Sequence, residues 1–190
     1  MSQAPPRHPR LLDRTAAALV VIDVQEAYRS VLHEYERVAR ATALLVQGAR
    51  ALGVPILVTE QYPKGIGHTV PEVAEHLPRE LVPIEKLSMS CCGSAGFVAA
   101  LAGLRRHQVI LAGIETHACV NQTAHDLMAA GYAVHLVKDT TSSRRPADAE
   151  VGWQKMLAGG VVPASLESAL LELVHSAESP DFKAIQRLIR

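Results

Sequence analysis

Aromatic side chains are scarce in this chain: Phe, Trp and Tyr together make up 4% of its 190 residues. The core must therefore be filled by Ala, Val, Leu and Ile, and the stacking platform of a protein that binds single-stranded nucleic acid is missing. An excess of charge of one sign is missing too, because 19 Lys and Arg balance 19 Asp and Glu. Strong nonspecific affinity for polyanions is not expected, so nucleic acid and anionic membranes are not predicted partners.

Cysteines and long apolar runs are also few. Three cysteines, Cys91, Cys92 and Cys119, are an odd number and too few for a secreted scaffold held by disulfides. The longest apolar run, Ala16–Ile22, is far shorter than the roughly 20 residues that cross a bilayer. The first residues contain no stretch that resembles a secretory signal. We therefore expect a cytoplasmic protein with free thiols, at least one of them available for chemistry.

What the chain has is enough apolar material for one domain. Hydrophobic residues make up 48% and charged residues 20% of the sequence, which is typical of a folded globule. We predict a single domain over residues 1–190, in which residues 1–14 form a flexible N-terminal extension.

Apolar runs that suit buried strands alternate with stretches of helical periodicity, a pattern typical of βαβ units with a parallel sheet. The first such unit contains a helix whose apolar positions recur between Val38 and Leu52. Residues 61–83 are expected to form one long irregular loop, of the kind that often borders active sites. The predicted strands cover residues 17–23, 54–60, 81–85, 108–114, 132–139 and 160–163, and the later helices residues 95–104, 116–130, 147–157, 166–177 and 181–189.

Three chemically capable residues stand at the ends of predicted strands, where ligands bind in open parallel sheets. Asp23 ends the first strand, Lys86 follows the third, and Cys119 begins the helix after the fourth. Each has a plainer interpretation alone: a turn residue, a solvated surface charge and a small buried hydrophobe, respectively. Their coincidence at equivalent strand ends favours a common site.

In such a site the thiol would be the nucleophile. The first turn of a helix and a neighbouring ammonium both favour a thiolate, so the sequence predicts an acidic thiol at Cys119 with Lys86 beside it. Asp23 would accept the thiol proton. The amides of the same turn could bind the oxyanion of a tetrahedral intermediate. The sequence therefore predicts a hydrolase with a nucleophilic cysteine.

Three segments carry a family resemblance: LVVIDVQ, IEKLSMSCCG and GIETHACVNQTAHDLMAAGYAVHLVKDTTSSR. They resemble the isochorismatase-like cysteine hydrolases, a superfamily that includes nicotinamidases and N-carbamoylsarcosine amidase, over residues 15–190. The resemblance implies a three-layer α/β/α Rossmann-like sandwich with a six-stranded parallel sheet, and a catalytic triad of Asp23, Lys86 and Cys119. It also implies a cis peptide at Ile114–Glu115, with the amides of Glu115 and Cys119 as the oxyanion hole.

The chain also departs from parts of that pattern. Metal-dependent nicotinamidases carry an Asp-x-His motif after the second strand, where this chain reads TEQYPKGIGHT. We therefore predict neither a metal nor another cofactor, and nicotinamide is a weak substrate candidate. The TEQYPKG segment resembles an isochorismatase-domain subgroup without an established substrate. Met89 stands where relatives often have an aromatic residue, so the pocket wall is expected to be pliable.

Further residues near the strand ends are candidates for contact with substrate. The predicted substrate-binding residues are Gln25, Glu60, Tyr62 and Ile114, although Gln25 could equally be a turn residue and Glu60 and Tyr62 could belong to an ordinary surface loop. His117 is expected to help start a helix rather than act as a base. Cys91 and Cys92 lack a second pair at metal-ligand spacing and are expected to be structural thiols.

The leading hypothesis is a cofactor-independent hydrolase of a small amide or related carbonyl compound that works through a thioester on Cys119. One alternative is hydrolysis of a vinyl ether such as isochorismate, in which Asp23 protonates the substrate and the thiol matters less. Another is a binding or scaffold member of the same fold with little catalysis. The apolar C-terminal segments are expected to support a homo-oligomer, a dimer or a tetramer.

Overall fold

Buried apolar runs form the six strands of the sheet, and every neighbouring pair of strands is parallel. The computed structural model describes residues 7–190. All residues of β1 and β4 are buried, as expected for strands covered on both faces. The strand order is β3-β2-β1-β4-β5-β6, so it reverses between β1 and β4. The strands are β1 (Ala17–Ile22), β2 (Ile56–Gln61), β3 (Ile84–Lys86), β4 (Gln108–Ile114), β5 (Ala133–Ser142) and β6 (Val162–Ala164).

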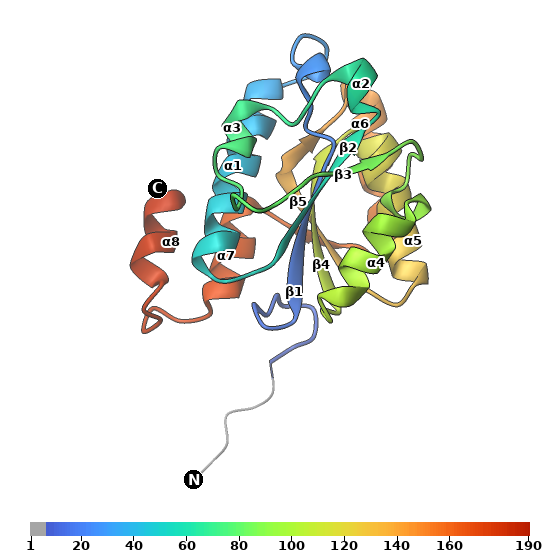
Figure 1. The fold of residues 1–190 in the computed structure, drawn as a ribbon. Coiled ribbons are helices and arrows are strands. Elements are labelled where there is room, and N and C mark those ends of the chain that lie inside the picture. The colour runs from blue at the N-terminus through green and yellow to red at the C-terminus, as the bar shows by residue number, and fades with distance from the viewer. Residues whose placement is uncertain (1–6) are drawn as a thin grey trace.

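Helices cover both faces of this sheet (Figure 1). One apolar cluster packs α1, α3, α7 and α8 against one face, and a second packs α4, α5 and α6 against the other. The helices are α1 (Tyr35–Ala51), α2 (Pro63–Ile66), α3 (Pro71–Ala74), α4 (Ala95–Gly103), α5 (Asn121–Ala129), α6 (Pro146–Gly159), α7 (Leu166–Val174) and α8 (Phe182–Leu188). Three short helical turns complete the chain: η1 (Glu26–Tyr28), η2 (Cys91–Gly93) and η3 (Thr116–Val120). The predicted α/β/α sandwich with a six-stranded parallel sheet is confirmed.

Two local predictions need correction. The expected irregular loop over residues 61–83 contains α2 and α3, each with a proline in its first turn. Proline suits that position because its fixed φ is helical and its missing N–H would have no partner there. The helix expected over residues 116–130 is divided, since its first turn, η3, is a π-helix and only the remainder is α-helical.

The described part of the N-terminal segment is packed rather than extended. Leu12 is fully buried in the core, and its amide donates to Glu172 Oε2 at 2.8 Å. Arg7 donates to the carbonyls of Leu12 and Glu172. The expected extension over residues 1–14 therefore does not include residues 7–14, and its first six residues lie outside the described part.

Within residues 7–190, each helix is too short or too polar to span a bilayer. The predicted location in the cytoplasm stays a prediction.

Candidate active site

The candidate site lies where the strand order reverses, at the carboxyl ends of β1 and β4. Asp23 follows β1 directly and adopts a left-handed conformation with φ 53°, which Asp tolerates better than most residues. At the neighbouring strand Gly113 has φ 125°, and a Cβ there would lie 2.0 Å from the carbonyl oxygen of Ile22. Only glycine allows β1 and β4 to approach so closely at this point.

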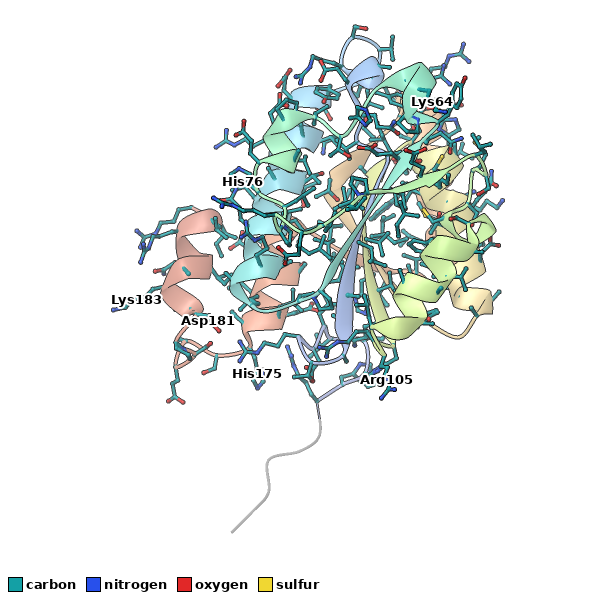
Figure 2. All side chains as sticks on the ribbon, in the orientation of Figure 1. Lys64, His76, Arg105, His175, Asp181 and Lys183 are labelled. Carbon is teal, nitrogen blue, oxygen red and sulfur yellow. The ribbon has the colours of Figure 1, made fainter. Side chains whose placement is uncertain are left out.

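Lys64, in α2, marks this end of the molecule, with Arg105 and His175 at the opposite end (Figure 2). Lys64 and Lys86 line the same hollow, which places the candidate site at the α2 end of the sheet.

Asp23 and Lys86 form a buried ion pair. Lys86 Nζ donates to Asp23 Oδ2 at 2.6 Å, and the two side chains are 0% and 1% exposed. Thr59 Oγ1, from β2, donates to the other carboxylate oxygen at 2.7 Å. Burial alone lowers the pKa of Lys86, but the charge of Asp23 and a smaller effect of Cys119 outweigh it and raise that pKa. The lysine therefore carries its proton in the folded protein.

The ammonium of Lys86 has little donor capacity left for a substrate. Besides Asp23, it donates to Gln61 Oε1 at 2.7 Å and to the carbonyls of Ser88 and Met89, each at 3.2 Å. An ammonium has three N–H donors. Because these are already directed at protein acceptors, Lys86 can act by charge and by orienting Asp23, and a direct bond to substrate would require it to give up one partner.

Cys119 lies in η3, on the far side of the switch point from Lys86. Its side chain is free and 6% exposed. The turn packs closely on α6, since a Cβ at Gly152 would lie 2.6 Å from His117 Cα. The peptide bond before this turn, Ile114–Glu115, is cis. The glycine of α6 thus lets the helix support the turn that carries the thiol.

The expected acidic thiol is not present in the resting protein. Burial, the negative charge of Asp23 and a hydrogen bond to that carboxylate raise the pKa of Cys119 to about 12, although the charge of Lys86 acts in the opposite direction. The sequence argument weighed the lysine and the helical turn but not desolvation, which disfavours the thiolate. Cys119 is therefore a neutral thiol in the resting protein, and any attack by its sulfur on a substrate would require deprotonation.

Beyond Cys119, a second ion pair borders the site. Glu115 begins the η3 turn, and its carboxylate accepts from the amide of Arg144 at 2.9 Å and from Arg144 Nε at 3.0 Å. Glu115 is 5% and Arg144 61% exposed. Burial raises the pKa of Tyr28, the charges of Glu115, Cys119 and Asp23 raise it further, and Arg144 opposes them. The phenol of Tyr28 therefore keeps its proton at neutral pH.

Of the predicted substrate-binding residues, Gln25 and Glu60 have their polar atoms committed elsewhere. The amide of Gln25 donates to the carbonyls of Gln61 and Gly67 and accepts from the backbone of Gln61. Glu60 accepts from the backbone and hydroxyl of Thr69 and lies 2.9 Å from His68 Nδ1. Burial raises the pKa of Glu60, but these hydrogen bonds lower it overall. Both side chains fix the loop after β2.

The other two predicted residues differ from each other. The side chain of Ile114 is fully buried in the apolar cluster on the α1 face. Tyr62 is 52% exposed and, together with Leu87 and Ser88, lines a hollow of about 470 Å³ that reaches Lys86. Of the four predicted substrate-binding residues, Tyr62 is thus the one that lines a cavity together with Lys86.

The remaining candidates have structural surroundings. Cys91 is fully buried, its sulfur lies 3.6 Å from Thr59 Oγ1, and burial raises its pKa to about 11. Cys92 is half-buried. His117 Nδ1 lies 2.9 Å from Ser143 Oγ, which ties the η3 turn to the end of β5.

Thr59, Gln61 and Arg144 were not identified from the sequence. The sequence contained a signal for Thr59: side chains alternate along a strand, so Thr59 faces the side opposite to Glu60. In the structure Thr59 pairs with Ile22, the residue before Asp23. Gln61 and Arg144 gain their significance from hydrogen-bond partners far along the chain, Lys86 and Glu115. A single sequence does not reveal these pairings.

The loop after β2 does not fit a metal ion. Its two candidate ligands, Glu60 and His68, bind each other, and no group of three potential side-chain ligands gathers anywhere in residues 7–190.

Together these features define a class of protein: a doubly wound α/β/α sandwich that brings a buried Asp–Lys pair and a cysteine to its switch point. The chain belongs to the isochorismatase domain family, whose model matches residues 17–168. The predicted family is thereby confirmed.

Known relatives agree with this assignment. Isochorismatase domain-containing protein 1 of Salmo salar is 42% identical over 88% of this chain. The matched region is only 59% of that relative's length. The structure of the MAR1 ribonuclease from Caenorhabditis elegans is 37% identical, with a TM-score of 0.90 over 94% of this chain and 92% of that one. The ycaC gene product of Escherichia coli, described as an octameric hydrolase of unknown specificity, shares the fold at 21% identity, with a TM-score of 0.88 over 96% of this chain and 92% of that one.

Proposed function

We propose that this protein is a cysteine hydrolase of small amides or related carbonyl compounds, with Asp23, Lys86 and Cys119 as its catalytic residues. One observation carries the proposal: a buried Asp–Lys ion pair at the same switch point as a buried free cysteine, whose pKa the Asp23 carboxylate raises. Burying two charges is costly unless they are paired. A base held ready beside a nucleophile explains why this pair would be kept in the interior.

In the proposed reaction, Asp23 takes the proton of Cys119 as the sulfur attacks the substrate carbonyl. Because the resting pKa of the thiol is about 12, proton transfer and attack have to be coupled. The amides of Glu115 and Cys119 would bind the oxyanion. Lys86 holds Asp23 in place and offsets its charge.

The second half of the proposed cycle regenerates the thiol. The protonated Asp23 gives its proton to the leaving amine, and the C–N bond breaks to leave a thioester on Cys119. Water, activated by the same carboxylate, then hydrolyses the thioester and releases the acid. Asp23 thus serves both half-reactions as the proton carrier.

Mass spectrometry of the intact protein after incubation with a library of small amides tests this proposal. We expect an acyl adduct that maps to Cys119 and is absent from Cys119→Ala. The matched control is Cys92→Ala, which removes a half-buried thiol outside the triad and should leave the adduct unchanged. Turnover that survives in Cys119→Ala would contradict the nucleophile assignment and favour vinyl-ether hydrolysis through Asp23. Neither adduct nor turnover would favour a binding protein.

RNA belongs in the same assay, because the Caenorhabditis elegans relative is named a ribonuclease. The balanced charge and few aromatic residues of this chain argue against RNA as its substrate. Cleavage of RNA that is lost in Cys119→Ala would show that the same triad acts on a different substrate class.

We also propose that the protein forms homo-oligomers, as the octameric Escherichia coli relative does. Light scattering coupled to size-exclusion chromatography gives the number of copies, and a mass of 20.4 kDa would show a monomer.

A further inference from the structure

A chain of buried hydrogen bonds connects Cys91, a thiol outside the proposed triad, with the carboxylate of Asp23. Thr59 Oγ1 lies 2.7 Å from Asp23 Oδ1 and 3.6 Å from the sulfur of Cys91. All three residues are at most 1% exposed, so bulk solvent does not reach these groups. Cys91 therefore contacts the proposed base through one intervening hydroxyl.

The direction of each hydrogen bond follows from the protons available. A hydroxyl has one O–H to donate and two lone pairs that accept. As the anionic member of the ion pair with Lys86, Asp23 can only accept, so the single O–H of Thr59 is used there. The contact with Cys91 then has the S–H as donor and Thr59 Oγ1 as acceptor. Burial and the charge of Asp23 raise the pKa of Cys91 to about 11, so the thiol keeps the proton that it donates.

The outer hydrogen bond strengthens the inner one. A hydroxyl that accepts a hydrogen bond is polarised and becomes a better donor through its own O–H, especially in an interior of low dielectric. Lys86 donates to Asp23 Oδ2 and Thr59 to Oδ1, and these two bonds set the orientation of the carboxylate. The thiol of Cys91 thus acts on the group that would take the proton of Cys119.

The backbone of Cys91 is attached to the helix that follows the proposed nucleophile. Its amide donates to Thr123 Oγ1 at 2.9 Å. Thr123 lies in α5, four residues after Cys119 and about one helical turn further along. Cys91 therefore contacts the proposed base through its side chain and the nucleophile's helix through its backbone. A side-chain substitution tests the first contact and leaves the second in place.

We propose that Cys91 is a positioning residue, whose S–H donates to Thr59 and thereby holds the carboxylate of Asp23 ready for the proton of Cys119. This inference rests on the proposed function, in which Asp23 is the base and Cys119 the nucleophile. Cys92, in the same short turn, is the matched control. It is half-buried, and its amide donates to Ser90 Oγ, which is not part of this hydrogen-bond chain.

Raman spectroscopy of the S–H stretch tests the hydrogen bond itself, because this band stands apart from other protein bands and shifts to lower frequency when the thiol donates. The Cys91 band is the one lost in both Cys91→Ala and Cys91→Ser. We expect it at lower frequency than the band of a free thiol in an apolar solvent. Thr59→Val should shift it upward, and Cys92→Ala should leave it in place.

Alkylation of Cys119 by iodoacetamide tests the consequence for reactivity. The sulfur forms a bond to carbon, iodide leaves with the electron pair, and the thiol proton passes to Asp23. The rate, followed by peptide mass spectrometry, should fall roughly tenfold in Thr59→Val and about threefold in Cys91→Ala, since an S–H is the weaker donor. Cys91→Ser supplies a shorter donor and should recover part of that loss. Cys92→Ala should keep the original rate.

A double-mutant cycle separates positioning from packing. If Cys91 acts through Thr59, Cys91→Ala should slow alkylation in the original protein but not in the Thr59→Val background. Equal slowing in both backgrounds would overturn the inference, as would a Cys91 band at the frequency of a free thiol, which the original protein and Cys91→Ser show even where another variant does not fold. Either result leaves the proposed function standing. A Cys119 inert to iodoacetamide would overturn the nucleophile and the role of Cys91 together.

Discussion

The polar groups at the carboxyl ends of β1, β2 and β3 differ from those at the ends of β4 and β5. On the first side, both oxygens of Asp23 and the ammonium of Lys86 have protein partners at close range. On the second side, Cys119 is a free thiol, and Nη1 and Nη2 of Arg144 have no hydrogen-bond partner within residues 7–190. The first side is completed by the fold, and the second is where we expect the proposed substrate to bind.

The two sides of the site are therefore suited to different tasks, the first to holding reacting groups in position and the second to recognising a ligand. Groups that are fully paired before substrate arrives are held in position and need no reorganisation during reaction. Groups with unused donors can recognise a molecule from outside. Substitutions on the paired side should therefore affect folding stability as well as chemistry, whereas substitutions on the open side should affect mainly reactivity and selectivity.

Lys86→Met is expected to have the largest effect on stability. It leaves the carboxylate of Asp23 buried without its counter-charge, and breaking one partner of a buried pair costs about 3 to 5 kcal/mol. Urea unfolding measures the loss. The double variant Asp23→Asn/Lys86→Met should recover most of it, and Lys64→Met, an exposed lysine at the same end, should change little. A Lys86→Met protein as stable as the original would show that the pair is not part of the structural framework.

Alkaline pH provides the next test, on the thiol side. The folded pKa of Cys119, about 12, lies above its ordinary value of 9.0. The neutral thiol thus contributes stability that is complete below about pH 9 and is lost as pH rises toward 12. Between pH 8 and 11 the original protein should lose on the order of 2 kcal/mol more unfolding free energy than Cys119→Ala. Equal losses in both proteins would mean that the thiol is not desolvated.

Thr59→Val should have a smaller effect. It keeps the shape of the side chain but removes the hydroxyl that donates to Asp23 Oδ1, which we expect to cost about 1 to 2 kcal/mol in urea unfolding. Thr42→Val is a matched control. Thr42 is equally buried, but its hydroxyl has no partner among the described residues, so its loss should be neutral or stabilising. Similar costs for both variants would remove the special role of Thr59.

How far the sequence predicts this molecule depends on how local each feature is. Apolar runs in β1 and β4 indicate buried strands because such strands must be apolar on both faces. The first turns of α2 and α3 had a local signal as well, in Pro63 and Pro71, but the four prolines and two glycines of residues 61–83 favoured an irregular loop. The order of the strands around the switch point brings Asp23 and Cys119 to one edge, which strand ends alone could indicate.

Features that depend on packing could not be predicted in the same way. The sequence indicated an acidic thiol because the lysine and the helical turn are visible in it. The desolvation that reverses this result comes from the packing around η3, to which α6 contributes through Gly152, far along the chain. Gln25 and Glu60 likewise stand near the right strands, but their partners at Gly67 and Thr69 become apparent only once the loop is folded.

Gln61→Met should have the smallest effect, and it tests how complete the paired side is. The substitution removes the Oε1 that accepts from Lys86, at a position that is only partly buried. Water can replace that acceptor, so we expect a loss of about 0.5 to 1 kcal/mol in urea unfolding, against almost none for the exposed Gln122→Met. If Lys86 then turns away from Asp23, alkylation of Cys119 by iodoacetamide should change its pH dependence, which a purely structural role of Gln61 would leave unaltered. A loss as large as that of Lys86→Met would instead make Gln61 an equal partner of the ion pair.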